Sequence, residues 1–340
     1  MLTDKKISIV VACYRDAGSI LPMLERLTKV MARITPEWEV IYVNDDSPDN
    51  AEAVLIEQAA KIDKLTVISH ARNFGAQVAF TTGMMQADGD AVVIMDGDLQ
   101  DPPELIEDFV KLWLAGNDVV YGIRAKRHEG LVRNVGYKLF YYLFQKISYV
   151  PIALDAGEFS LMDRAVVEVI LACPERDRLI RGLRSYAGLR QTGVPFERPK
   201  RYAGESTQGL LDYFMWVVKS FTSYSLFPLR FINFLAFCVA LLLGCMAVYY
   251  LVAFLFGKSA PHGYMTVLLL GLSLAALVLF SLGIIGEYVG RLFIEIKGRP
   301  QPVLRLLIND HRRQPHAWLG RTCPRQPAEK SSTESLDQSQ

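Results

Sequence analysis

Two long apolar runs near the carboxyl end of the chain constrain its fold more than any other feature. Phe231–Gly257 contains no charged residue, and only His262 and the final Glu interrupt Ser259–Glu287. Each run exceeds the roughly 20 residues that a helix needs to cross a bilayer. Proline and glycine lie in the short connector, where they favour a break between two helices. We therefore expect a transmembrane hairpin with spans over 229–257 and 264–290.

Basic residues around the two apolar runs predict the orientation of the hairpin. Lysine and arginine flank its outer ends, at Lys219, Arg230, Arg291, Lys297, Arg299, Arg305, Arg312 and Arg313, whereas the connector has only Lys258. Because basic loops remain in the cytoplasm, both termini and the residues before the first apolar run are expected on the cytosolic side of the membrane. The lipid bilayer is thus an expected partner.

Overall composition narrows the function classes further. The 340 residues are 51% hydrophobic and 21% charged, and 37 Lys and Arg balance 36 Asp and Glu to give a net charge of +1. This balance provides no basic footprint for nucleic acid, so none is expected as a partner. The five cysteines include no CxxC pair and the five histidines no HExxH, so neither a zinc ribbon nor a histidine-based metal site is indicated.

The first 205 residues alternate short β-branched runs with amphipathic segments. Strands are expected over 7–12, 39–43, 65–69, 91–95 and 119–121, and helices over 21–34, 51–62 and 105–114. This alternation indicates an α/β domain with a mostly parallel, Rossmann-like sheet. Ligands bind beyond the carboxyl ends of the strands in such sheets. The residues that follow the five strands are Tyr14 with Asp16, Asp45 with Asp46, His70 with Arg72, Asp96 with Asp98, and Arg124.

The segment Asp96-Gly97-Asp98 is the most informative of these strand ends. A divalent cation that bridges phosphates is commonly held by one or two carboxylates, with phosphate and water oxygens as its other ligands. A turn in which Asp and Gly satisfy backbone groups is the competing interpretation. The chain contains neither GxxxxGK[ST] nor GxGxxG, which argues against a P-loop enzyme and a dinucleotide oxidoreductase. The interpretation that remains is a site in which acidic residues and a metal ion hold a nucleotide.

Six motifs in order resemble the inverting family 2 glycosyltransferases with a GT-A fold. They are VVACY from Val10, VNDDS from Val43, ARNFG from Ala71, DGDLQDPPE from Asp96, GEFSLMDR from Gly157 and GEYVGR from Gly286. Within that family the chain is most similar to polyprenyl-phosphate glycosyltransferases of the dolichol-phosphate mannose synthase and bactoprenol glucosyltransferase type. The resemblance covers roughly residues 6 to 305.

This resemblance implies roles for the residues at the strand ends. Tyr14, Asp16, Asp45, Arg72 and Asp96 would bind the nucleotide. Asp98, Asp96 and Gln100 would hold Mg²⁺ or Mn²⁺. The chain departs from the family pattern at the first strand, where Arg15-Asp16 stands in place of Asn-Glu.

The resemblance implies that the catalytic carboxylate lies in the GEFSLMDR motif or just before it. Glu158 is the first candidate and Asp155 the second, and a helix-capping role is the alternative for either. The second pKa of a phosphate monoester is roughly 6, so a lipid phosphate needs orientation more than a strong base. The cations expected at the acceptor phosphate or the departing pyrophosphate are Arg201, Arg127 and Arg124, with a solvated surface as the alternative.

The resulting hypothesis is transfer of a hexose from a UDP-sugar, favoured over a GDP-sugar, to undecaprenyl or another polyprenyl phosphate, with inversion. The alternatives are a processive polysaccharide synthase and a non-catalytic scaffold or flippase with a nucleotide-sensing domain. The expected segments are a GT-A domain over 1–205, an amphipathic juxtamembrane helix over 206–228, the two spans, a basic cytosolic segment over 291–313 and a disordered tail over 314–340. A GxxxG at Gly286 to Gly290 would permit a homo-oligomer.

Overall fold

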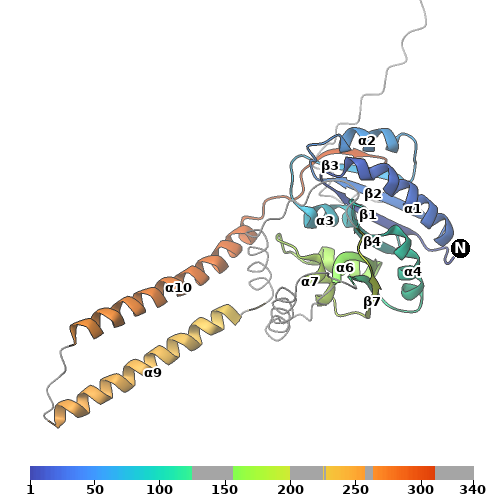
Figure 1. The fold of residues 1–340 in the computed structure, drawn as a ribbon. Coiled ribbons are helices and arrows are strands. Elements are labelled where there is room, and N and C mark those ends of the chain that lie inside the picture. Colours follow the sequence, from blue (N-terminus) through green and yellow to red (C-terminus); the bar gives the residue numbers. More distant parts are fainter. Residues whose placement is uncertain (125–155, 200–224, 226, 257–262, 311–340) are drawn as a thin grey trace, which may run out of the picture. The chain divides into compact units, whose positions relative to one another are not determined.

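A computed structural model describes residues 1–124, 156–199, 225, 227–256 and 263–310 (Figure 1). The chain forms two compact units. The first contains the amino-terminal part of the chain together with residues that follow the apolar hairpin, and the second contains the hairpin. The expected helix over 206–228 and the expected tail over 314–340 lie almost wholly outside the described residues.

The described part of the first unit is built on a mixed sheet with the strand order β7-β5-β6-β4-β1-β2-β3-β8. The strands are β1 Ile7–Cys13, β2 Trp38–Asn44, β3 Leu65–His70, β4 Ala91–Asp96, β5 Val119–Arg124, β6 Ala156–Asp163, β7 Gln191–Phe196 and β8 Leu304–Ile308. The expected parallel strands are confirmed: β4, β1, β2 and β3 pair in parallel. Two antiparallel strands were not foreseen, β6 between β4 and β5, and β8 beside β3.

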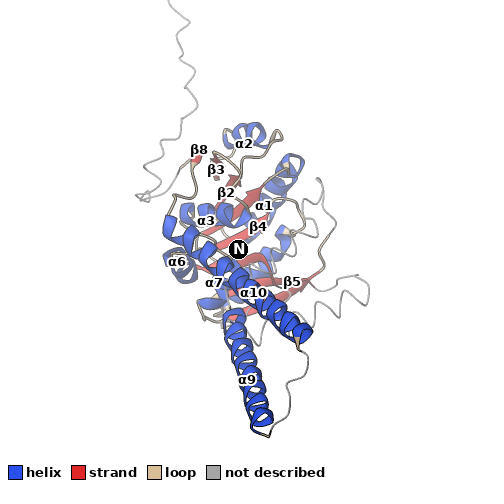
Figure 2. Cartoon of the chain, turned by 90° about the vertical axis from the view of Figure 1, so that its left-hand side faces the viewer, coloured by secondary structure: helices blue, strands red, loops and turns tan. Residues whose placement is uncertain are grey.

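Helices cover both faces of this sheet (Figure 2). They are α1 Ile20–Ile34, α2 Ala51–Ala59, α3 Ala76–Gln86, α4 Ile106–Leu114, α6 Arg164–Ala172 and α7 Ile180–Tyr186, with short 3₁₀ turns at Ala17–Ser19 and Pro103–Leu105. Alternate residues of β1 enter opposite cores. Ile9 packs in the same core as residues of α1, α2 and α4, whereas Val10 packs in the same core as residues of α3, α6 and α7. Burial on both faces explains why the parallel strands are continuous apolar runs.

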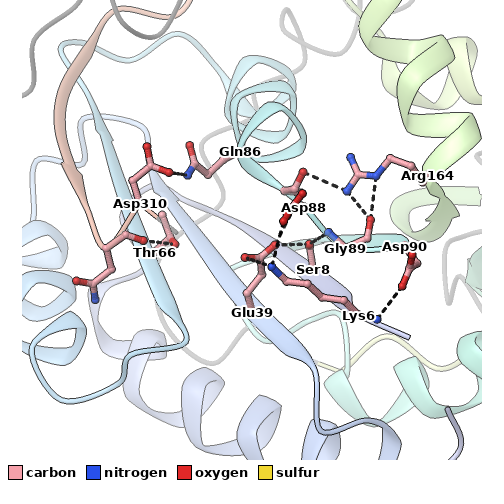
Figure 3. A network of polar contacts seen from close by, with 12 residues as sticks. Lys6, Ser8, Glu39, Thr66, Gln86, Asp88, Gly89, Asp90, Arg164 and Asp310 are labelled. Atoms are coloured by element: carbon pink, nitrogen blue, oxygen red, sulfur yellow. Dashed lines mark hydrogen bonds and ion pairs between the residues drawn. The ribbon is translucent and has the colours of Figure 1, made fainter. Parts of the chain in front are cut away.

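Strand β8 returns to the sheet after the apolar hairpin. Its register pairs Ile68 with Leu307, and the Thr66 hydroxyl donates to the Asn309 carbonyl at 2.8 Å (Figure 3). Arg305 of β8 forms ion pairs with Asp46 at 2.7 Å and Glu52 at 2.6 Å. The region over 291–313 is therefore more than a basic segment: its first residues extend α10 and five later residues complete the sheet.

Buried polar contacts join the amino ends of β1, β2 and β4 (Figure 3). The Ser8 hydroxyl donates to Glu39 Oε1 at 2.6 Å and accepts from the Gly89 N–H at 2.8 Å. Lys6 Nζ lies 3.1 Å from Glu39 Oε2. Arg164 donates to the carbonyls of Ala87 and Gly89. These contacts fix the end of the sheet opposite to the predicted site.

The described part of the second unit contains α9, Phe227–Leu255, and α10, Tyr264–Lys297 (Figure 1). Both helices are long and apolar enough to cross a membrane, over Phe227–Met246 and Leu270–Lys297, and neither window is buried. Tyr288 Oη donates to the Ser225 carbonyl at 2.7 Å, which ties α10 to the chain just before α9. The observed helices contain the predicted spans over 229–257 and 264–290, except for the last two residues of the first.

Candidate active site

Backbone hydrogen bonds draw together the loops that follow β1, β2 and β4. The Asp45 N–H donates to the Cys13 carbonyl at 3.0 Å, and the Gly97 N–H donates to the Ala12 carbonyl at 2.9 Å. These strands are adjacent and parallel, so their carboxyl ends meet at one edge of the sheet. The residues that follow them, including Tyr14, Asp45 and Asp96, are therefore neighbours, as the sequence predicts.

Asp45 is buried and organises the loop between β3 and α3. Its Oδ1 accepts the Phe74 N–H at 2.8 Å and lies 2.7 Å from His70 Nδ1, and its Oδ2 accepts the Gly75 N–H at 2.7 Å. His70 is fully buried, and its Nε2 lies 3.0 Å from Thr82 Oγ1 on α3. Asp45 thus fixes the start of α3, a role that the sequence did not reveal.

The other expected nucleotide-binding residues lie on the loops beside Asp45. Asp16 Oδ2 accepts the Tyr14 N–H at 3.5 Å, and the Arg15 guanidinium lies over the Tyr14 ring at 5.3 Å from its centroid. The Arg15 N–H donates to Ser47 Oγ at 2.7 Å, which joins the loops after β1 and β2. Arg72 is exposed, and its guanidinium lies 4.5 Å from the Phe74 ring centroid.

Three carboxylates gather in the loop after β4. Asp101 Oδ2 accepts the Asp96 N–H at 3.2 Å, and Asp98 Oδ1 accepts the Gln100 N–H at 3.0 Å. Asp98 and Asp101 are each 2% exposed, whereas the Asp96 side chain is 36% exposed. Despite this exposure, partial burial and the charges of Asp101 and Asp98 raise the pKa of Asp96 above its usual range. Arg198 Nη2 lies 3.7 Å from Asp96 Oδ2 and partly offsets this negative charge.

These carboxylates fit a divalent cation that shares its ligands with a nucleotide. Asp96 and Asp98 offer hard oxygen donors, and a cation would relieve the part of the raised pKa of Asp96 that comes, after burial, from the charges of Asp101 and Asp98. Within the described residues, no group of three or more His, Cys, Asp or Glu could hold an ion by itself. Phosphate and water oxygens would therefore complete the coordination. The Gln100 amide donates to the Pro199 carbonyl at 3.3 Å.

Glu158 lies on β6, next to the β4 carboxylates. The antiparallel register pairs Ile94 with Ser160, two residues from Asp96 and Glu158 respectively, and the Glu158 charge contributes to the raised pKa of Asp96. Glu158 Oε1 accepts from Gln77 Nε2 at 3.1 Å and lies 3.4 Å from Arg181 Nε. Its Oε2 is buried and has no hydrogen-bond partner among the described residues.

Cationic side chains surround this carboxylate. Arg184 of α7 is 1% exposed, lies 4.8 Å from the Tyr121 ring centroid and donates to the Gly157 carbonyl at 3.5 Å. Burial lowers the pKa of Arg184 to about 10, although the Glu158 charge opposes this shift. Arg124, at the end of β5, lies close to Gly157, so that a Cβ there would be 3.4 Å from Arg124 Nη2. The structure thus brings the predicted cation Arg124 to Gly157, the residue before Glu158.

Three predicted site residues, Asp155, Arg127 and Arg201, lie outside the described residues. Conversely, Gln77, Arg181 and Arg184 were not among the predicted site residues. Arg181 and Arg184 carry a weak signal, because a cluster of arginines on a short helix is unusual, but the antiparallel insertion of β6 is what brings them to the site. Gln77 has no sequence signal of its own.

The model of the family described as "Glycosyl transferase family 2" matches residues 8–171. A bactoprenol glucosyl transferase derived from a prophage of Shigella flexneri is 33% identical over 312 residues, which cover 91% of this chain and all of the relative. The chain belongs to glycosyl transferase family 2. It is a glycosyltransferase, and the mixed sheet with its carboxylates after β4 is the GT-A arrangement that the sequence predicts.

A second relative is also described as a glycosyltransferase. An uncharacterized glycosyltransferase of Bacillus subtilis is 35% identical over 297 residues, which cover 86% of this glycosyltransferase and 91% of the relative. Among solved structures, a mannosyltransferase from Pyrobaculum calidifontis in complex with GDP-Man and Mn²⁺ aligns over 59% of each chain, with 21% identity and a TM-score of 0.43.

Proposed function

We propose that this glycosyltransferase transfers a hexose from a UDP-sugar to a polyprenyl phosphate, with inversion, at the cytosolic face of a bacterial inner membrane. The observation that carries the proposal is the juxtaposition of the Asp96 and Asp98 carboxylates with Glu158 and the cations around it. Its full-length similarity to bactoprenol glucosyl transferases supports a lipid phosphate as the acceptor. The two apolar helices would hold the enzyme at the membrane where such a lipid lies.

In this proposal the residues at the strand ends bind the nucleotide-sugar donor and its metal ion. Tyr14, Asp16 and Arg72, on loops fixed around Asp45, would bind the base and ribose. Asp96 and Asp98 would hold Mg²⁺ or Mn²⁺, which would supply charge neutralisation for the departing diphosphate.

The reaction itself needs few proton transfers. An oxygen of the lipid phosphate attacks the anomeric carbon from the side opposite the diphosphate, the bond from that carbon to the diphosphate oxygen breaks, and UDP leaves. Arg124 and Arg198 would stabilise the phosphate charges, because a guanidinium donates two parallel hydrogen bonds to such oxygens. Glu158 would orient the acceptor and accept a proton that remains on it.

The return of the chain after the hairpin supports the proposed topology. Residues 156–199, before the hairpin, and strand β8, after it, belong to the first unit, and β8 pairs with β3 within its sheet. A hairpin of two spans that leaves this unit and returns to it would have both ends on the side of the membrane that contains the catalytic domain. The excess of basic residues at these ends favours the cytosol.

The first experiment incubates the purified, detergent-solubilised full chain with undecaprenyl phosphate, Mg²⁺ or Mn²⁺, and a panel of UDP- and GDP-sugars, followed by mass spectrometry of the lipid. A glycosylated lipid formed from a UDP-hexose is the expected product. A product from a GDP-sugar alone would correct the donor, and no product with any donor would oppose the proposed function.

Asp98→Asn then tests the role of the carboxylates. Loss of one metal-binding charge should lower kcat at least about 100-fold, in the range observed when one group that stabilises transition-state charge is removed. Asp108→Asn, on the exposed surface of α4, is the matched control and should retain the wild-type rate. Equal rates for the two variants would refute the metal-dependent mechanism.

A further inference from the structure

We propose that Gln77 is a positioning residue, which holds Glu158 in the orientation required for glycosyl transfer. This inference rests on the proposed role of Glu158 and goes beyond it, because Gln77 belongs to a different element. Gln77 lies in the first turn of α3, whereas Glu158 lies on β6, 81 residues later in the chain.

Two hydrogen bonds fix the direction of the Gln77 amide. The Ile180 N–H donates to Gln77 Oε1 at 2.8 Å, and Gln77 Nε2 donates to Glu158 Oε1 at 3.1 Å. A flipped amide would place its NH₂ against the Ile180 N–H and its oxygen against the carboxylate, so both contacts would become repulsive. The main chain of α7 therefore ensures that Gln77 always presents an N–H to Glu158.

The two carboxylate oxygens of Glu158 therefore have different hydrogen-bond partners. Oε1 receives the Gln77 amide and faces Arg181 Nε at 3.4 Å, whereas Oε2 is buried without a hydrogen-bond partner among the described residues. The side chain is 15% exposed. A buried acceptor that lacks a donor is costly, so such a group calls for an explanation, such as a catalytic role or a bound water or ion. The geometry thus leaves Oε2 to accept an O–H from a substrate.

The same contacts connect Glu158 to the proposed nucleotide side of the site. Asp45 accepts the N–H groups of Phe74 and Gly75, and Gly75 is the residue that precedes α3, with a φ of 93°. Asp45 therefore fixes the start of the helix, and Gln77, two residues after Gly75, transmits that position to Glu158. A purely structural role, in which Gln77 only joins α3 to α7, is the alternative that the test must separate.

Gln77→Glu and Gln77→Leu separate these roles. The glutamate variant retains an oxygen for the Ile180 N–H, so the link between α3 and α7 survives, but it places a second carboxylate oxygen against Glu158 Oε1. The leucine variant removes both hydrogen bonds. We expect kcat to fall about 10- to 100-fold in the leucine variant, as is typical when a partner that orients an active group is lost. The fall should be larger in the glutamate variant, with the KM for the nucleotide-sugar within about two-fold of wild type in both.

Gln86 provides a matched control on the same helix. It is 2% exposed, and its Nε2 donates to Asp310 Oδ1 at 2.7 Å, so it is another α3 glutamine that donates to a carboxylate (Figure 3). Gln86→Glu and Gln86→Leu impose the same change away from the candidate site. They should lower the melting temperature and leave kcat per folded enzyme unchanged.

The assay is product formation from undecaprenyl phosphate by the full chain, alongside thermal melting of all variants and of Glu158→Gln. A loss of kcat in the Gln77 variants beyond that of the Gln86 variants supports the inference. Wild-type kcat in Gln77→Glu, while Glu158→Gln is inactive, would overturn the positioning role and leave the proposed function intact. Wild-type kcat in Glu158→Gln would also overturn it. Failure of the wild-type chain to form any product would instead refute the proposed function.

Discussion

Asp45→Asn should destabilise the catalytic unit, because Asp45 acts only as an acceptor. The three donors around it are the Phe74 N–H, the Gly75 N–H and the His70 ring. The asparagine amide can take two orientations. If its oxygen occupies the Oδ1 position, its NH₂ group occupies the Oδ2 position and faces the Gly75 N–H, which lies 2.7 Å from Oδ2 in the native protein. If the amide is turned over, its NH₂ group faces the Phe74 N–H and the His70 ring instead. Either orientation leaves at least one donor opposed.

The magnitude follows from these contacts. One buried donor without a partner costs about 1 to 3 kcal/mol, and the remaining bonds lose the added strength of a charged acceptor, about 1 kcal/mol. The expected destabilisation is therefore about 2 to 4 kcal/mol. For a unit of this size, 1 kcal/mol shifts the melting temperature by about 2 to 4 °C, so a decrease of roughly 4 to 16 °C is expected.

Thermal unfolding of the detergent-solubilised full chain, without nucleotide, measures this change independently of catalysis. Asp46→Asn is the control, since Asp46 is a half-exposed neighbour whose ion pair with Arg305 should contribute at most about 1 kcal/mol. If the two variants melted at the same temperature, the argument that Asp45 fixes the loop before α3 would be refuted.

Two further predictions concern packing and pH. Gly83→Ala would place a Cβ 2.1 Å from Val10 Cγ1, and we expect thermal melting to show a destabilisation of about 1 to 3 kcal/mol. Adding Val10→Ala should restore part of this stability. If the effects of the two substitutions were strictly additive, the predicted clash would be contradicted. Arg26 donates to Glu104 Oε1 at 2.9 Å and holds the pKa of that carboxyl below its usual range. The ion pair therefore stabilises the fold fully when the pH is above the pKa of Glu104 in the unfolded chain, which is roughly 4.3. This stabilisation is lost as the pH falls through the lower pKa of Glu104 in the folded protein. Both side chains are exposed by a third or more, so Arg26→Gln should cost less than about 1 kcal/mol at pH 7. This cost should shrink as the pH falls through the folded pKa of Glu104, and a cost that does not change on acidification would be inconsistent with the pair.

Local patterns were sufficient for the parallel half of the sheet. Ile7–Cys13 and Ala91–Asp96 are mostly apolar runs, and each extends one residue beyond the strand predicted over 7–12 or 91–95. Both apolar helices were equally clear, because their length and lack of charge leave few alternatives. These features depend on neighbours in the chain, which a sequence displays directly.

Strands that pair over long distances were not predictable in this way. β8 lies 234 residues beyond β3, and five residues after a hairpin give no periodicity that distinguishes a strand from a loop. β6 is antiparallel to both its neighbours, and nothing in its own residues specifies that insertion. The pairing of such strands depends on which faces and edges of the sheet are still exposed after the other helices and strands have packed.

The sequence by itself determined which side chains are available to the candidate site, namely the carboxylates Asp96 and Asp98 at the end of one strand and Glu158 in a later motif. Only the tertiary structure decided which groups contact them. It brought Glu158 close to Asp96, gave Asp45 two donors from one loop and a third from the end of β3, and brought Gln77 to Glu158. The sequence specifies the type of each side chain, whereas the groups that each side chain contacts depend on packing between helices and strands that are distant in the chain.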